Sequence, residues 1–211
     1  MNIVSYLADI YGYDTPIFLK DVRIGRKSKS AIKEAFYRAV KTGELKREDQ
    51  GVYYLKSEKE FGNVITFTDV LKKKYFYSDD VAPGFEELFV EGYYSGLTFL
   101  NMIGISEQVP AVPEITTNKT SSKKRWIKYR SMQAIVRKAR TKVTSQNWKM
   151  LQFLDMFHFV SLEEVKENKQ LLRDYIKKNS LSKYQFSQCG KYYGPQTFKK
   201  LTEGGIIDAF I

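Results

Sequence analysis

The sequence predicts an α+β protein in which an N-terminal winged helix-turn-helix domain is followed by a C-terminal mixed α/β domain. Three observations support this fold class. Two short β-prone runs at 45–47 and 52–55 flank a turn that ends in Gly51, which predicts a hairpin. Residues 123–143 alternate in part between apolar and basic side chains, which predicts two more strands. Ahead of the hairpin, apolar residues with helical spacing form one stripe, at Ile32, Ala35, Phe36, Ala39 and Val40.

We place the first domain at residues 1–60. Residues 2–12 are predicted to form an amphipathic helix that ends at Gly12. A short helix at 16–22 should follow, because Thr15 can cap it and Pro16 suits the first helical position, where a missing N–H costs nothing. Ser28 or Ser30 then caps the helix that carries the apolar stripe, and Gly43 fits the left-handed position after its last turn. This order of elements is that of a winged domain.

We place the second domain at residues 61–211, because the charged, glycine-containing segment 56–63 indicates a boundary. Helices are predicted at 64–77 and 91–102, with a loop at 79–84 between them. Two prolines favour an extended segment at 109–113, and a strand should follow at 114–117. Ser161 and Glu164 form a capping-box pattern for a helix at 162–178. Further helices are predicted at 147–160 and 196–201.

The 211 residues carry a formal net charge of +11, and this charge is unevenly distributed. Residues 119–142 contain ten Lys and Arg side chains and no Asp or Glu. A net charge this far from zero indicates a polyanionic partner, such as DNA, RNA or an anionic membrane surface. Hydrophobic residues make up 43% of the chain and aromatic residues 15%, enough to fill a core, which argues against global disorder.

No apolar run approaches the roughly 20 residues that span a bilayer. Residues 1–14 also lack the basic start and the continuous apolar stretch of a signal peptide. We therefore expect a cytoplasmic protein that does not enter a membrane. The single cysteine, Cys189, excludes an internal disulfide, and the single histidine, His158, leaves no Cys/His zinc cluster. We expect no metal and no cofactor.

The sequence contains little that indicates catalysis, and we expect neither enzyme activity nor catalytic residues. His158 stands between two phenylalanines, which predicts a partly buried core histidine, and Cys189 has no partner histidine nearby in the sequence. Residues 163–166 resemble a nuclease Glu-x-Lys triplet, with Asp155 upstream. A metal-dependent nuclease needs this triplet on a strand. These residues open a predicted helix instead, so a nuclease is the weaker interpretation.

Residues 92–122 read GYYSGLTFLNMIGISEQVPAVPEITTNKTSS. They resemble the abortive-infection antitoxins of the AbiEi group, in which a small-residue helix ending hGL (h, hydrophobic) precedes the pattern xQVPxxxxxxT. The winged helix upstream and the basic strands downstream match the family's order of parts. Ile105 departs from the pattern, since many relatives have threonine or leucine there. The matching residues are Ser95, Leu100, Ile103, Gly104, Gln108, Val109, Pro110, Thr116 and Thr117.

The resemblance implies a transcriptional autorepressor and antitoxin, encoded with its toxin in a bacterial abortive-infection operon that gives phage resistance. Members of the family bind inverted repeats in their own promoter through the winged domain. Their C-terminal domain antagonises a nucleotidyltransferase-like toxin without forming a stable complex with it. The expected partners are therefore double-stranded operator DNA and, functionally, the cognate toxin.

Candidate DNA contacts lie on the helix with the apolar stripe and on the hairpin. Cations at the start of this helix would meet phosphates, and polar residues farther along it would reach base edges in the major groove. The alternative is an ordinary solvated lysine face. The candidates are Arg23, Arg26, Lys27, Lys29, Ser30, Lys33, Tyr37, Lys46, Arg47 and Gln50.

The basic segment 119–142 is a second candidate surface. Trp126 and Tyr129 stand among its cations, and such a mixture suits single-stranded RNA, whose bases stack on rings, or a phosphate track on duplex DNA. An RNA-binding module that uses this segment is the alternative function. A toxin-antagonising surface, or a solvated sheet face partly neutralised by the acidic segment 61–118, would explain the same pattern. The candidates are Lys123, Lys124, Arg125, Lys128, Arg130, Arg137, Lys138 and Arg140.

Overall fold

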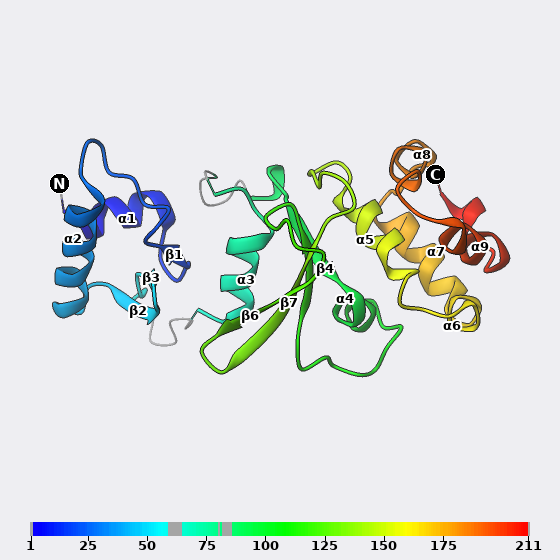
Figure 1. Ribbon diagram of the computed structural model, residues 1–211, viewed down its shortest axis with the longest axis horizontal. Helices are drawn as coiled ribbons and strands as arrows, with labels where there is room; N and C mark the ends of the chain where they lie inside the picture. Colours follow the sequence, from blue (N-terminus) through cyan, green and yellow to red (C-terminus); the bar gives the residue numbers. More distant parts are fainter. Residues whose placement is uncertain (1, 59–64, 80, 82–85, 211) are drawn as a thin grey trace. The chain divides into compact units, whose positions relative to one another are not determined.

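The computed structural model describes residues 2–58, 65–79, 81 and 86–210, which form a mixed α+β structure (Figure 1). Within these ranges it contains nine α-helices and two small sheets, and the predicted α+β class is confirmed. None of the helices in the described ranges is long and apolar enough to cross a membrane.

The chain divides into two compact units. The first comprises residues 1–89 and 129–131, and the second comprises residues 90–128 and 132–211. The functional division at residue 60 stays a prediction. Much of the predicted boundary segment 56–63 and of the loop at 79–84 lies outside the described residues, as does the start of the helix predicted at 64–77.

The described residues of the first unit form three α-helices and a three-stranded antiparallel sheet in the order β1-β3-β2. The helix predicted at 2–12, the helix with the apolar stripe and the hairpin are confirmed, and α3 lies within the range predicted as 64–77. The elements are α1 (Ile3–Tyr11), β1 (Ile17–Phe18), α2 (Lys29–Lys41), β2 (Lys46–Asp49), β3 (Val52–Tyr54), α3 (Phe67–Tyr75) and a 3-10 turn, η1 (Glu86–Leu88).

Helix α2 begins and ends at the residues that its sequence predicts. Ser28 Oγ accepts a hydrogen bond from the Ala31 N–H at 3.2 Å, and Gly43, after the last turn, has a φ of +82°. One face of the helix is buried, with Phe36 fully covered and its ring edge-on to Tyr53 at 4.9 Å. The core around it consists of Leu7, Ile17, Val22, Ile24, Ile32, Phe36, Ala39, Leu45 and Leu55.

The short helix predicted at 16–22 is wrong. Ile17 and Phe18 form β1 and pair with β3, and the residues after them form a turn. Both of these consecutive side chains are buried, whereas a surface helix covers only one stripe. The Thr15 hydroxyl donates to the Tyr13 carbonyl oxygen at 3.2 Å. Burial on both sides of β1 and pairing with β3 therefore outweigh the local helix-start signal.

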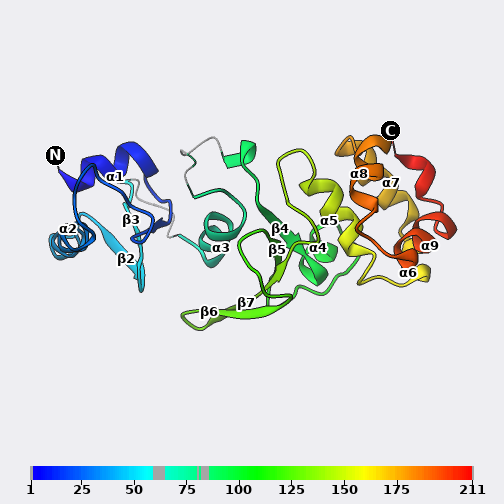
Figure 2. The same cartoon turned by 45° about the horizontal axis from the view of Figure 1, so that its top comes forward.

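The second unit contains a four-stranded sheet in the order β4-β5-β7-β6, with β4 antiparallel and β7 parallel to β5. The last residue of β6, Tyr129, belongs to the first unit. Helix α4 contacts β4 and β5, and helix α5 contacts β4. Helices α6 to α9 lie on the side of α5 away from the sheet (Figure 2). The elements are β4 (Gly92–Ser95), α4 (Gly96–Met102), β5 (Glu114–Thr117), β6 (Arg125–Tyr129), β7 (Met132–Lys138), α5 (Trp148–Met156), α6 (Leu162–Glu167), α7 (Lys169–Lys178), α8 (Lys183–Gly190), α9 (Pro195–Glu203) and a 3-10 turn, η2 (Ile207–Ala209).

The strand predicted at 114–117 and the two strands predicted within 123–143 are confirmed, but the helix predicted at 91–102 is only half right. Its first half is strand β4, in which Tyr93 and Tyr94 pair with Thr116 and Ile115 of β5. Gly96, the first residue of α4, follows the strand directly and has a φ of +58°, a backbone conformation that breaks any continuous helix through residues 91–102. The pairing with β5 therefore decides the conformation of residues 92–95.

The C-terminal helices agree with the prediction except at two places. The capping box of Ser161 and Glu164 is confirmed, but the predicted 162–178 helix is divided at Asn168, whose Nδ2 donates to the Glu164 carbonyl oxygen at 2.9 Å. Helix α8 was not predicted, although Ser182 and Gln185 form the same kind of capping box.

We expect Gly96→Ala to lower the free energy of unfolding by about 2 kcal/mol. Alanine would be strained at the positive φ of this position, and its Cβ would collide with a neighbouring side chain. A Cβ on Gly96 would lie 2.7 Å from Glu114 Oε2, and Arg137 holds that carboxylate at 2.9 Å. Gly104→Ala is the matched control. It also has a positive φ, but its nearest heavy atom would be Leu171 Cδ1 at 3.7 Å, so it should cost only about 1 kcal/mol. Equal losses in urea denaturation of the two variants would contradict the collision.

Candidate nucleic-acid interface and basic cleft

The outer face of α2 is exposed to solvent. Lys29, Ser30, Lys33 and Tyr37 are all exposed, Tyr37 at 64%. Lys41 and Arg38 lie on the same side of the helix and are also exposed. They were not among the candidates, although Lys41 follows Tyr37 by one helical turn. The single acidic residue of α2, Glu34, lies 3.7 Å from Arg38, so this face keeps an excess of positive charge.

The N-terminus of α2 is electrostatically suited to a phosphate group. Its first turn has no acidic side chain, and Arg26 and Lys27 immediately before it are exposed. The unpaired backbone N–H groups of a helix start carry partial positive charge, which adds to the charge of nearby cations. Six of the ten candidates, from Arg26 to Tyr37, are thus brought together on or beside one exposed helix.

The other four candidates of the first unit differ in how they are held. Arg23 is exposed, but its Nη1 donates to the carbonyl oxygens of Lys20 and Val22 at 2.6 and 3.0 Å, which braces its own turn. Lys46, Arg47 and Gln50 are exposed on the β2–β3 hairpin. Arg47 makes one long hydrogen bond on the hairpin, in which its Nε–H donates to the Asp49 carbonyl oxygen at 3.4 Å.

The eight basic candidates of segment 119–142 do not form one surface. Lys124, Arg125 and Lys128 are exposed on or just before the edge strand β6. Arg130 belongs to the first unit, where its Nη1 lies 2.9 Å from Glu48 Oε1. The remaining four, Lys123, Arg137, Lys138 and Arg140, line a single cleft of about 540 Å³ in the second unit.

We use the name basic cleft for the cavity lined by these four cations together with Ser95, Thr116, Ala139, Asp155, His158 and Phe159. Strand register explains part of this gathering. Tyr93, Thr116 and Arg137 are paired across β4, β5 and β7, so their side chains share one face of the sheet. Ser95 and Thr116, two of the residues that carry the antitoxin resemblance, are buried here, and the Thr116 hydroxyl donates to Ser95 Oγ at 2.9 Å.

Two of the four cations in the basic cleft are held by carboxylates. Arg137 Nε donates to Glu114 Oε2 at 2.9 Å, and the Arg137 guanidinium lies 5.7 Å from the Phe159 ring centroid. Arg140 Nε donates to Asp155 Oδ1 at 3.2 Å and stacks over the ring of Tyr193 at 5.0 Å. Lys123 and Lys138 are exposed and have no carboxylate partner among the described residues.

Asp155 lies beneath the basic cleft and is 8% exposed. Its Oδ2 accepts from the Tyr93 hydroxyl at 2.7 Å and its Oδ1 from the Tyr193 hydroxyl at 2.9 Å. Burial raises the pKa of Asp155, and the donated hydrogen bonds from the two tyrosines and Arg140 oppose that rise. The same burial raises the pKa of the Tyr93 hydroxyl far above its ordinary value. The carboxyl group thus links β4, α5 and the segment after β7.

The expected core position of His158 is wrong, because this side chain is exposed at the edge of the basic cleft, edge-on to Phe159. The turn after α5 carries it outward. Cys189 is buried, which raises the pKa of its thiol. Residues 163–166 open helix α6, as predicted. Among the described residues, no group of three or more His, Cys, Asp or Glu side chains is placed to hold a metal ion.

Comparison with known proteins finds no matching family model, no matching curated protein and no matching solved structure.

Proposed function

We propose that the protein is a DNA-binding transcriptional autorepressor and antitoxin, in which the first unit acts as a winged helix-turn-helix. Helix α2 would be the recognition helix and the β2–β3 hairpin the wing. The observation that carries this proposal is the exposed outer face of α2, which holds four cations and one acid. The conventional first helix of the motif would be replaced by β1 and the turn after it.

Affinity for DNA would come mainly from phosphate contacts. Each neutralised phosphate releases condensed counterions, so the logarithm of the binding constant falls with the logarithm of the salt concentration by about 0.9 per contact. In this arrangement Lys33 and Arg47 contact phosphates from the helix and from the hairpin. Ser30 and Tyr37, which carry no charge, are the candidates for contacts with base edges.

We expect Lys33→Ala with Arg47→Ala to weaken binding to a duplex that spans the protein's own promoter, and to lower the salt slope by about 2. Fluorescence anisotropy at several salt concentrations measures both quantities. The matched control is Lys177→Ala with Lys178→Ala, which removes the same charge from the exposed end of α7. An unchanged slope in the first variant, or equal losses in both, would refute the assignment of α2 and the hairpin to DNA.

The antitoxin part of the proposal is supported by the resemblance of residues 92–122. If it is correct, co-expression of this protein should relieve the growth arrest caused by a nucleotidyltransferase-like toxin encoded beside it. The variant with weakened DNA binding, Lys33→Ala with Arg47→Ala, should still protect when both genes are expressed from foreign promoters, because its second unit is unchanged. Loss of protection in that variant would contradict the division of roles.

An RNA-binding module is the second candidate, and one observation favours it. Trp126 is 57% exposed on the edge strand β6, and Lys124 Nζ lies 5.9 Å from its ring centroid. An exposed ring beside cations suits stacking with an unpaired base. Tighter binding of the full chain to structured RNA than to the promoter duplex, lost in Trp126→Ala, would favour this function over repression.

A further inference from the structure

We propose that the basic cleft binds a short phosphate chain, of the kind that nucleoside di- and triphosphates carry. This goes beyond the proposed function and does not depend on DNA binding by the first unit. The cleft lies entirely in the second unit, and its volume of about 540 Å³ is in the range of small-molecule sites.

The charge of the basic cleft is the first argument. Four cations from three stretches of chain converge on it: Lys123 before β6, Arg137 and Lys138 on β7, and Arg140 after β7. Glu114 and Asp155 neutralise the two arginines, which leaves two lysines without a carboxylate partner among the described residues. Like charges around one cavity repel each other, and a multivalent anion relieves that repulsion.

The hydrogen-bonding capacity of the basic cleft is the second argument. Each guanidinium has five N–H donors, and the described ion pairs engage only the Nε–H of Arg137 and of Arg140. The remaining donors are fixed in direction, because the carboxylates and the rings of Phe159 and Tyr193 hold both guanidinium groups in place. Planar guanidinium groups held in this way suit phosphate oxygens.

The third argument concerns the hydroxyl groups. Ser95 Oγ accepts the Thr116 hydroxyl hydrogen and, in the described contacts, donates its own hydrogen to no partner. Ser95 is only 2% exposed, so its hydroxyl lacks bulk water as an acceptor. A phosphate oxygen in the basic cleft would be an acceptor for it. The exposed imidazole of His158 and the ring of Phe159 lie at the same cleft, where a nucleoside attached to the phosphates would meet them.

Isothermal titration calorimetry with the full-length chain tests the proposal. The ligands are ATP, GTP and inorganic tripolyphosphate, with adenosine as the ligand that lacks phosphate. We expect the phosphorylated ligands to bind and adenosine not to bind. If a nucleotide binds more tightly than tripolyphosphate, the ligand of the basic cleft is a nucleotide. If their affinities are equal, the basic cleft recognises the phosphate chain alone.

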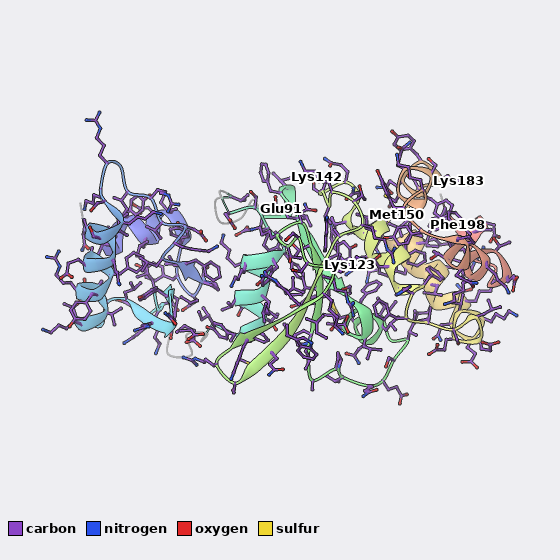
Figure 3. The ribbon with its side chains drawn as sticks, viewed as in Figure 1. Glu91, Lys123, Lys142, Met150, Lys183 and Phe198 are labelled. Atoms are coloured by element: carbon purple, nitrogen blue, oxygen red, sulfur yellow. The ribbon has the colours of Figure 1, made fainter. Side chains whose placement is uncertain are left out.

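A pair of charge-matched variants locates the site. Lys123→Gln with Lys138→Gln should weaken binding about tenfold, as expected for the loss of charged hydrogen bonds to phosphate. Lys124→Gln with Lys142→Gln removes the same charge from exposed residues that do not line the basic cleft, and it should leave the affinity unchanged. Figure 3 labels Lys123 and Lys142, which lie well apart. Absence of binding by every phosphorylated ligand, or equal weakening in the two variants, would overturn the proposal.

Discussion

Phe36→Ala is expected to lower the free energy of unfolding of the first unit by about 4 kcal/mol, the largest effect of a single substitution that we predict. Phe36 is fully buried in the core formed by α1, α2 and the sheet, and its ring packs edge-on against Tyr53. Alanine would leave a cavity that this small core cannot fill. Far-UV circular dichroism during urea denaturation measures the loss.

The neighbouring residue provides the control. Tyr37 is 64% exposed on the outer face of α2, so Tyr37→Ala should change stability by no more than about 0.5 kcal/mol. If the proposed function is correct, Tyr37→Ala should nevertheless weaken operator binding. Similar destabilisation by the two substitutions would show that the helix is rotated relative to the arrangement described here. The pair therefore separates the face that builds the fold from the face proposed to contact DNA.

Helix α2 and its hairpin could be predicted from the sequence because their signals are local. The apolar spacing, the serine cap and the glycine after the last turn all lie within about four residues of the backbone they govern. Periodicity in such a segment determines which face is buried, so the exposure of Lys33 and Tyr37 followed directly from the pattern. The same holds for the capping box at Ser161.

The strands β1 and β4 could not be predicted because their signals are not local. Ile17 and Phe18 become a strand through β3, more than 30 residues later, and Tyr93 and Tyr94 through β5. Short helix signals, such as Pro16 after Thr15, lose to this pairing because a strand buries both of its faces. The glycine at position 96, which has a positive φ in the structure, is a local sequence feature that could have indicated the change from β4 to α4.

The basic cleft could be predicted only in part. The ten cations of segment 119–142 marked the region, but two kinds of information were missing from the linear pattern. Alternation along β7 gives no indication that Arg137 faces Thr116, because that contact follows from parallel pairing with β5. Nor does it connect Arg140 to Asp155, which is 15 residues later on α5. The positions of Ser95 and Thr116 in the basic cleft, and of the carboxylates of Glu114 and Asp155 beside its arginines, therefore require the three-dimensional structure.

Asp155→Ala is expected to lower the free energy of unfolding of the second unit by about 3 kcal/mol. Removal of one partner from a buried charged pair costs about 3–5 kcal/mol, and the lower end applies because the Arg140 side chain is 41% exposed and can be solvated. The Tyr93 hydroxyl would lose its described acceptor, whereas Tyr193 would keep the Leu151 carbonyl oxygen at 3.1 Å. Both tryptophans, Trp126 and Trp148, belong to the second unit, so tryptophan fluorescence during denaturation reports this change.

Two comparisons isolate the carboxylate. Asp174→Ala removes an exposed carboxylate bonded only to Gln170 in the described contacts, and should change stability by less than about 0.5 kcal/mol.

Asp155→Asn keeps the side-chain shape but cannot ionise. Because burial raises the pKa of Asp155, the folded chain binds this proton more tightly than the unfolded chain. The wild-type free energy of unfolding should therefore decline as pH rises from about 4 through the raised pKa. That contribution should be absent in Asp155→Asn, and an identical pH dependence in the two proteins would show that Asp155 is not the buried, proton-binding group that the structure indicates.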